Sequence, residues 1–97
     1  MTVRDNPDEL RYELVDGDTV VGLIRYRREP GALALVHTEI DPAHEGRGLG
    51  SVLVQGALDD LRERGLKLIP ICPYVRTWLG RHPEYGDLVT DDPATPD

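Results

Sequence analysis

The stretch Glu45-Gly46-Arg47-Gly48-Leu49-Gly50 places three glycines at alternate positions, directly before a segment with helical periodicity. Glycine has no side chain to cover its backbone, so several N–H groups of this loop are left open. The positive end of the following helix dipole adds to the same potential. A loop of this kind suits a diphosphate, although a purely structural turn has the same composition.

Two other glycine-rich motifs do not fit this loop. A dinucleotide-binding fingerprint would place a third glycine at Ser51 and would normally open a sheet of parallel strands. A nucleotide-binding P-loop needs Gly-Lys-Ser or Gly-Lys-Thr, and no lysine precedes Lys67. The sequence therefore favours a diphosphate ligand without an ATP site.

The segment after the loop predicts an amphipathic helix that ends near Gly65. Its apolar residues recur at positions i, i+3, i+4 and i+7, namely Val54, Ala57, Leu58 and Leu61. Gly56 inside this helix costs about 1 kcal/mol relative to alanine, which indicates a close approach to the sheet. Residues 66–71 then predict a strand. A strand, a helix and a strand with short connections predict a right-handed crossover, with residues 66–71 parallel to residues 32–40.

The segments before the loop predict an antiparallel meander of three strands, at residues 10–15, 19–28 and 32–40. The Asp-Gly pair between the first two is a strong hairpin signal, and Pro30-Gly31 marks the second turn. If no bulge interrupts the third strand, one face carries Leu33, Leu35, His37 and Glu39, and the other Ala34, Val36, Thr38 and Ile40.

A second helix is predicted from Pro73 to about Arg81, with its buried stripe at Val75, Trp78 and Leu79. Leu88-Val89 could add a short edge strand. The sequence thus predicts an α/β fold with a mixed sheet: an antiparallel three-stranded meander, a strand-helix-strand crossover and a C-terminal helix. We expect one domain over residues 1–97, with loose ends at 1–9 and 90–97.

Composition narrows the classes of function. The 97 residues carry 18 acidic and 11 basic side chains, a net charge of -7, and no basic stripe that could follow a phosphate backbone. We therefore expect no nucleic-acid partner, because the charge would attract a basic substrate instead. No stretch is apolar enough for a signal peptide or a membrane span, and the single Cys72 fits a reducing compartment, so a cytoplasmic location is expected. The three histidines show no metal-ligand spacing, and no metal is expected.

The glycine loop resembles the acetyl-coenzyme A loop of the GNAT N-acetyltransferase superfamily: Arg or Gln, two residues, Gly, one residue, then Gly or Ala. Gly48 and Gly50 match the closing positions. Glu45 replaces the usual Arg or Gln, so phosphate contacts would come from Arg47 or the backbone. The resemblance sharpens to a group of stand-alone minimal GNAT proteins and covers roughly residues 11–89, through His37-Thr38, the loop, residues 70–75 and residues 82–88.

This resemblance implies an N-acetyltransferase that takes acetyl-coenzyme A as donor and an amine as acceptor. The donor would lie between the splayed ends of the two parallel strands, against Ile40, Glu45, Gly46, Arg47, Gly48, Leu49, Gly50 and Ser51. Full-length relatives carry two helices between their first strands, for which the Asp16–Asp18 turn leaves no room. An open acceptor side, and a basic protein or peptide as acceptor, would follow. The alternatives are a coenzyme A-binding module without turnover and a plain interaction domain.

Four side chains are candidates for the chemistry. Cys72 lies at or beside a helix N-cap, where the dipole favours the thiolate, so it could act as nucleophile or base; a buried, inert cysteine is the other interpretation. Glu39 by position, and His37 by its titration range, are candidate bases for the amine. Tyr74 could protonate the leaving thiolate or serve only in packing.

Overall fold

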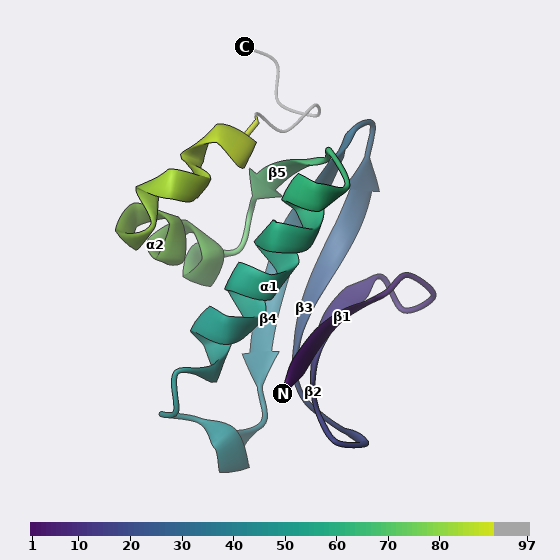
Figure 1. The fold of residues 1–97 in the computed structure, drawn as a ribbon, viewed down its shortest axis with the longest axis vertical. Helices are drawn as coiled ribbons and strands as arrows, with labels where there is room; N and C mark the ends of the chain where they lie inside the picture. The colour runs from purple at the N-terminus through teal and green to yellow at the C-terminus, as the bar shows by residue number, and fades with distance from the viewer. Residues whose placement is uncertain (91–97) are drawn as a thin grey trace.

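The computed structural model describes residues 1–90 of the chain. Its centre is a five-stranded sheet whose strands lie side by side in chain order (Figure 1). The strands are β1 (Thr2–Asn6), β2 (Arg11–Asp16), β3 (Thr19–Glu29), β4 (Ala32–Ile40) and β5 (Lys67–Pro70). The helices are α1 (Leu49–Glu63) and α2 (Pro73–Arg81), with short 3₁₀ helices η1 (Pro42–His44) and η2 (Pro83–Leu88).

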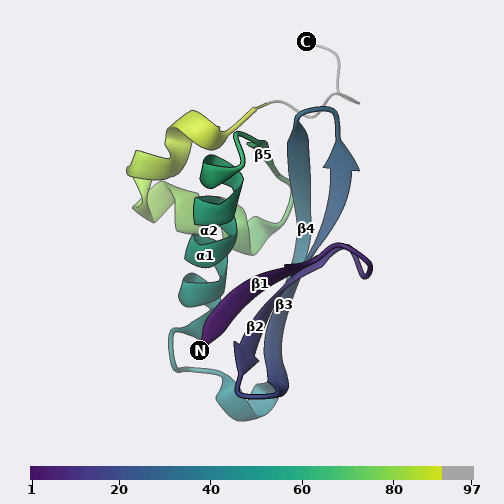
Figure 2. The same ribbon diagram turned by 45° about the vertical axis from the view of Figure 1, so that its right-hand side comes forward.

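The topology confirms the predicted α/β fold. Strands β1 to β4 pair antiparallel, and β5 pairs parallel to β4. Helix α1 makes the crossover between β4 and β5, and α2 follows β5 at its predicted limits. Figure 2 shows both helices on the same side of the sheet, so within residues 1–90 the opposite face has no helical cover. We refer to these as the covered and the open face.

The hydrophobic core lies between the covered face and the two helices. The apolar stripe of α1 is fully buried there, as its periodicity predicts. Helix α2 adds Val75 and Trp78 to the same cluster. The indole Nε1–H of Trp78 also donates a hydrogen bond to the hydroxyl of Ser51, at 2.8 Å. This bond joins the second helix to the first turn of α1, beside the glycine loop.

The N-terminal segment differs from the prediction that residues 1–9 are loose, because Thr2–Asn6 form an edge strand against β2. Val3 packs against α1 at Gly56, where an added Cβ would lie 2.6 Å from the Cβ of Val3. The predicted close approach of the helix to the sheet at Gly56 is therefore confirmed. The strand that lies closest to Gly56 is β1. The prediction failed because this strand lacks an alternating apolar pattern.

Polar side chains of the open face hold β1 in place. Glu13 is only 1% exposed and accepts hydrogen bonds from Arg4 Nε (2.9 Å), Arg11 Nε (2.7 Å) and Asn6 Nδ2 (3.1 Å). Burial by itself would raise the pKa of this carboxyl, but the three hydrogen bonds outweigh it and lower the pKa below its usual value. Two of these donors belong to β1, so a charged Glu13 ties the edge strand to β2.

The C-terminal part of the described chain forms η2 in place of a regular strand. The expected edge strand at Leu88-Val89 is reduced to a single bridge between Val89 and Leu68. The N–H of Thr90 extends this contact by donating to the carbonyl of Leu68, at 2.8 Å. Beyond Thr90, the predicted loose end at 90–97 lies outside the described residues.

A bulge in β4 overturns the simple face assignment. Arg25 pairs with His37 and the next residue of β3, Tyr26, pairs with Leu35, so Val36 is an extra residue. Leu33 and Leu35 therefore face the core together with Thr38 and Ile40. His37 and Glu39 do share a face, as predicted, but it is the open face and not that of Leu33 and Leu35.

Candidate functional site

A cavity of about 280 Å³ opens at the N-terminal end of α1. Gly46 and Gly48 in its wall have φ angles of 79° and 72°, values that glycine adopts without strain. A Cβ added at either position would meet no atom within 4 Å, so both glycines serve backbone conformation and access rather than tight packing. The lining residues are Thr38, Ile40, His44, Glu45, Gly46, Gly48, Leu49, Gly50 and Tyr74. We call this the loop cavity.

The first turn of α1 offers its backbone donors to the loop cavity. Gly48 is the N-cap and contributes no side-chain hydrogen bond. The N–H of Val52 bonds to the carbonyl of Gly48, so the N–H groups of residues 49–51 precede the helical ladder. Together with the helix dipole, these donors form the kind of site that binds a diphosphate.

Tyr74 closes the loop cavity from the side of α2. Its ring lies directly over Gly50, where an added Cβ would be 2.8 Å from the tyrosine Cζ. Gly50 is therefore needed for contact between the two helices and not for an unusual backbone angle. The Tyr74 side chain is 46% exposed, so its hydroxyl is at the cavity wall and within reach of a ligand.

The strands β4 and β5 separate beside this cavity. Their parallel pairing runs from Ala32 to Leu35, and the carbonyl of Leu35 accepts the N–H groups of both Ile71 and Cys72 as the chain leaves β5. Beyond that point β4 continues to Ile40 without β5 (Figure 1). The N–H of Asp41 donates to the carbonyl of Val21 in β3. Because backbone groups alternate in direction along a strand, those of Thr38 and Ile40 point away from β3, to the side where β5 no longer pairs with β4. A ligand amide can pair with this edge.

Cys72 lies where its position before Pro73 predicts, at the N-cap of α2. Its side chain is 3% exposed and is not in the wall of the loop cavity. The sulfur lies 3.4 Å from the hydroxyl oxygen of Thr38, which does line the cavity. Thr38 therefore stands between the thiol and any ligand in the loop cavity.

His37 and Glu39 lie on the open face, apart from Cys72 and Tyr74. The Nε2 atom of His37 is 3.5 Å from a carboxylate oxygen of Glu39, and both side chains are more than half exposed. They belong to the part of β4 that extends beyond β5. The four catalytic candidates are thus divided between the two faces of the separated strands.

Two of the predicted loop residues lie outside the lining of the loop cavity. Arg47 is exposed and does not line the loop cavity. The Ser51 hydroxyl accepts the hydrogen bond from Trp78 and keeps its own O–H as a donor, but Ser51 is not in the wall of the loop cavity.

His44 is a cavity residue that the sequence reasoning missed. Its Nδ1 atom is buried and has no hydrogen-bond partner among residues 1–90. In the tautomer with its proton on Nε2, no unpaired N–H is buried at Nδ1, and Nε2 is a hydrogen-bond donor. The signal available in the sequence was its place four residues before Gly48. His44 belongs to no metal-ligand pattern, so no motif in the sequence marks it as a site residue.

The part of the chain that forms the loop cavity lies within a match to a known family. The family described as GCN5-related N-acetyl-transferase matches residues 11–88. The chain belongs to this family of acyltransferases. The match spans the meander, the glycine loop and α2, and begins after β1, the strand that the sequence analysis missed. None of the curated proteins matches the chain.

Two solved structures share the fold of this chain. A GCN5-like putative N-acetyltransferase from Staphylococcus aureus superposes with a TM-score of 0.69 at 22% identity, over 94% of this chain and 89% of that chain. The ribosomal-protein-S18-alanine N-acetyltransferase of Escherichia coli gives a TM-score of 0.56 at 22% identity, over 63% of this chain and 40% of that chain. This chain therefore matches less than half of the longer Escherichia coli protein.

Residues 1–90 contain neither a membrane-spanning helix nor a cluster of metal ligands. None of their helices is both long and apolar enough to cross a membrane. No group of three histidine, cysteine or carboxylate side chains within them is arranged to hold a metal ion.

Proposed function

We propose that the protein is an N-acetyltransferase that takes acetyl-coenzyme A in the loop cavity and transfers its acetyl group to an amine. The observation that carries this proposal is the free edge of β4 directly beside the open N-terminus of α1. The first can pair with the amides of a pantetheine arm and the second can bind a diphosphate. These are two recognition elements of one extended ligand.

Donor binding rests mainly on backbone groups. The N–H groups of residues 49–51 bind the diphosphate, in a loop kept open by Gly46 and Gly48. His44 adds one side-chain hydrogen-bond donor through Nε2. Glu45 cannot bind the diphosphate through its side chain, because a carboxylate repels it. Thr38 and Ile40 hold the pantetheine arm along β4.

The transfer itself is a direct attack of the amine on the thioester. Glu39 takes one proton from the acceptor ammonium, and His37 beside it stabilises the charge change. The free amine attacks the acetyl carbonyl, so a C–N bond forms and the C–S bond breaks. Tyr74 gives its hydroxyl proton to the leaving thiolate and regains one from water, while the second amine proton passes to solvent.

The burial of Cys72 favours this direct route over a covalent one. The thiol is 3% exposed and its contact is the Thr38 hydroxyl, so an acetyl group in the loop cavity would meet Thr38 before the sulfur. In this proposal Cys72 packs the wall behind Thr38. A coenzyme A-binding module without turnover shares the same donor site and differs only in lacking the proton transfers.

Two measurements test the proposal. Acetyl-coenzyme A at about 100 times its dissociation constant adds about 2.7 kcal/mol of stability, which appears as a rise in Tm. Release of free coenzyme A thiol in the presence of an amine then reports turnover. Absence of any Tm change at millimolar acetyl-coenzyme A would defeat the proposal, and a Tm change without thiol release would leave a binding module.

The variant Cys72→Ala separates the direct from the covalent route. We expect it to keep turnover within a few-fold of the parent protein and to form no acetyl adduct detectable by mass. An acetylated parent protein whose adduct and turnover both disappear in this variant would establish the covalent route instead.

A further inference from the structure

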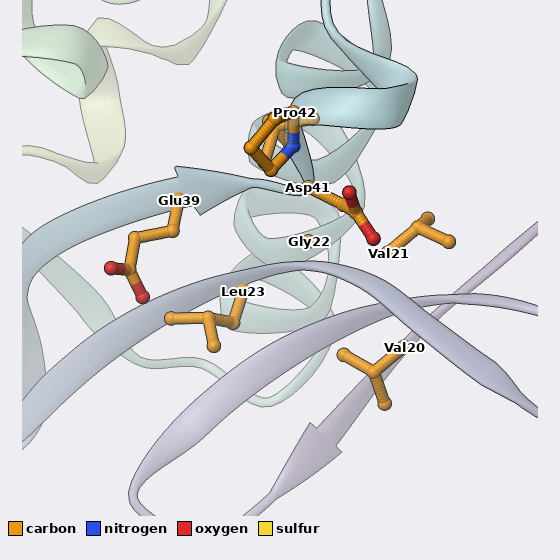
Figure 3. Close-up of a pocket in the computed structure, with 8 residues that line it drawn as sticks. Val20, Val21, Gly22, Leu23, Glu39, Asp41 and Pro42 are labelled. Atoms are coloured by element: carbon orange, nitrogen blue, oxygen red, sulfur yellow. The ribbon is translucent and has the colours of Figure 1, made fainter.

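A second cavity, of about 300 Å³, lies where β3 begins and β4 ends. Residues 20–23 and 39–42 line it, and Figure 3 shows their side chains. Glu39 and Leu23 pair across the two strands, and both alternate with the core-facing residues Ile24 and Thr38. They therefore project on the open face. We call this the open-face cavity.

The open-face cavity adjoins the proposed donor site. Ile40 lines both cavities, and Glu39 precedes it on the part of β4 that β5 has left. The two cavities thus lie on either side of one strand end. A group in the open-face cavity has the proposed base, Glu39, in its wall.

We propose that this cavity binds the acceptor, and that the acceptor is an alkylammonium: a primary amine on an apolar stem that carries no carboxylate. This inference rests on the proposed acetyl transfer and names the acceptor class for the same site. Glu39 and Asp41 supply negative charge, and the lining formed by the described part of the chain includes no lysine or arginine. A cation is attracted there and an anionic acceptor is repelled.

The apolar part of the cavity wall favours an acceptor with an apolar stem. Val20, Leu23 and Pro42 contribute side chains without polar groups. In the view of Figure 3 the carboxylates of Glu39 and Asp41 stand apart, with Leu23 and Val20 along the strand below them. Hydrophobic lining with a few polar groups is the usual construction of a small-molecule site, and the volume is at the lower limit for such sites. A short alkyl chain fits this description.

Asp41 is held in position by its own loop. One of its carboxylate oxygens accepts the N–H of Ala43 at 2.9 Å, as the N-cap of η1. The other oxygen remains available to an ammonium group. The substitution Asp41→Asn keeps the carbonyl that caps η1 and removes only the charge, so it tests recognition without removing the cap.

The test compares two amines of equal chain length, pentylamine and 5-aminopentanoate, by thiol release from acetyl-coenzyme A. We expect kcat/KM to favour pentylamine by about tenfold or more, because only 5-aminopentanoate brings a carboxylate to an acidic cavity. Asp41→Asn should raise KM for pentylamine several-fold, with the effect in KM rather than in kcat. Leu23→Lys should reverse the preference between the two amines.

The matched control is Glu63→Gln, which removes one exposed charge from the far end of α1 and should leave both KM values unchanged. Equal use of the two amines, or equal KM shifts in Asp41→Asn and Glu63→Gln, would overturn the inference. A Tm rise with acetyl-coenzyme A but turnover only on 5-aminopentanoate would overturn the acceptor class and keep acetyl transfer. Absence of the Tm rise would defeat the proposed function itself.

Discussion

The covered and open faces of the sheet are built by different means. The covered face is apolar, is packed by two helices, and presents the loop cavity through backbone groups at the start of α1. The open face carries the Glu13 network and the His37–Glu39 pair, and its cavity is formed by side chains. In the proposed reaction the donor meets fixed backbone dipoles, whereas the acceptor meets titratable groups.

This division separates binding from chemistry. Backbone donors hold a diphosphate whatever the protonation state of nearby side chains, and they depend only on the loop conformation. Proton transfer requires a side chain that titrates. Substitutions on the open face should therefore change turnover without changing donor binding, and substitutions in the glycine loop should do the reverse.

The largest effect is expected for Glu39→Gln, which removes the proposed base and keeps its size. We expect kcat to fall by about 100-fold or more, within the usual range for loss of a general base. The Tm rise with acetyl-coenzyme A should be unchanged, because the loop cavity is intact. Glu63→Gln is the control for the lost charge. A kcat within three-fold of the parent, ~0.6 kcal/mol in barrier, would remove Glu39 from the mechanism.

The second-largest effect is expected for Gly50→Val, which forces a side chain against the ring of Tyr74. Overpacking of this kind costs about 1–3 kcal/mol and displaces the cavity wall. We expect acetyl-coenzyme A to bind about 100-fold more weakly, or ~2.7 kcal/mol. Gly80→Ala, at an exposed helical glycine without neighbours, should leave affinity unchanged. Equal affinities in these two variants would contradict the proposed cavity.

The third prediction concerns the charged network that anchors β1. The pKa of Glu13 is lowered in the folded protein, so its contribution is present above the unfolded value of about 4.3 and is lost as pH falls through the folded pKa. Glu13→Gln should cost about 1–2 kcal/mol at pH 7 and flatten the decline of Tm with acid. Parallel Tm curves for the two proteins between pH 5 and about 3 would contradict this account.

The smallest effect is expected at His44. His44→Ala removes the Nε2–H donor and should weaken acetyl-coenzyme A binding about three- to tenfold, or ~1 kcal/mol, as loss of one hydrogen bond does. His44→Gln places an amide N–H near the same point and should restore much of the affinity. Acetyl-pantetheine, which lacks the diphosphate, should bind the parent and His44→Ala equally. A loss of equal size for both ligands would contradict a diphosphate contact.

The sequence predicted most of the covered face because its signals are local. Helix α1 follows from the spacing of Val54, Ala57, Leu58 and Leu61, and α2 ends at Arg81 as predicted. Strand β1 was missed because its attachment is not local. It depends on Gly56 in the helix and on Glu13 in the next strand, and neither signal lies in residues 2–6.

The open face could not be predicted, because its composition depends on register. A single extra residue at Val36 moves His37 and Glu39 to the side opposite Leu33 and Leu35, and no propensity in residues 32–40 marks that bulge. The burial of Cys72 behind Thr38 and the position of His44 in the cavity wall likewise required the folded chain.

The sequence by itself determined the order of the elements, the parallel crossover and the glycine loop that begins α1, because each follows from periodicity and from the conformations that glycine and proline permit. Only the tertiary structure decided which side chains meet. The bulge at Val36 and the separation of β4 from β5 after Leu35 place Glu39 and Tyr74 on different faces of the sheet. Contacts of this kind form between residues far apart in the chain, where local preference carries no information about distance.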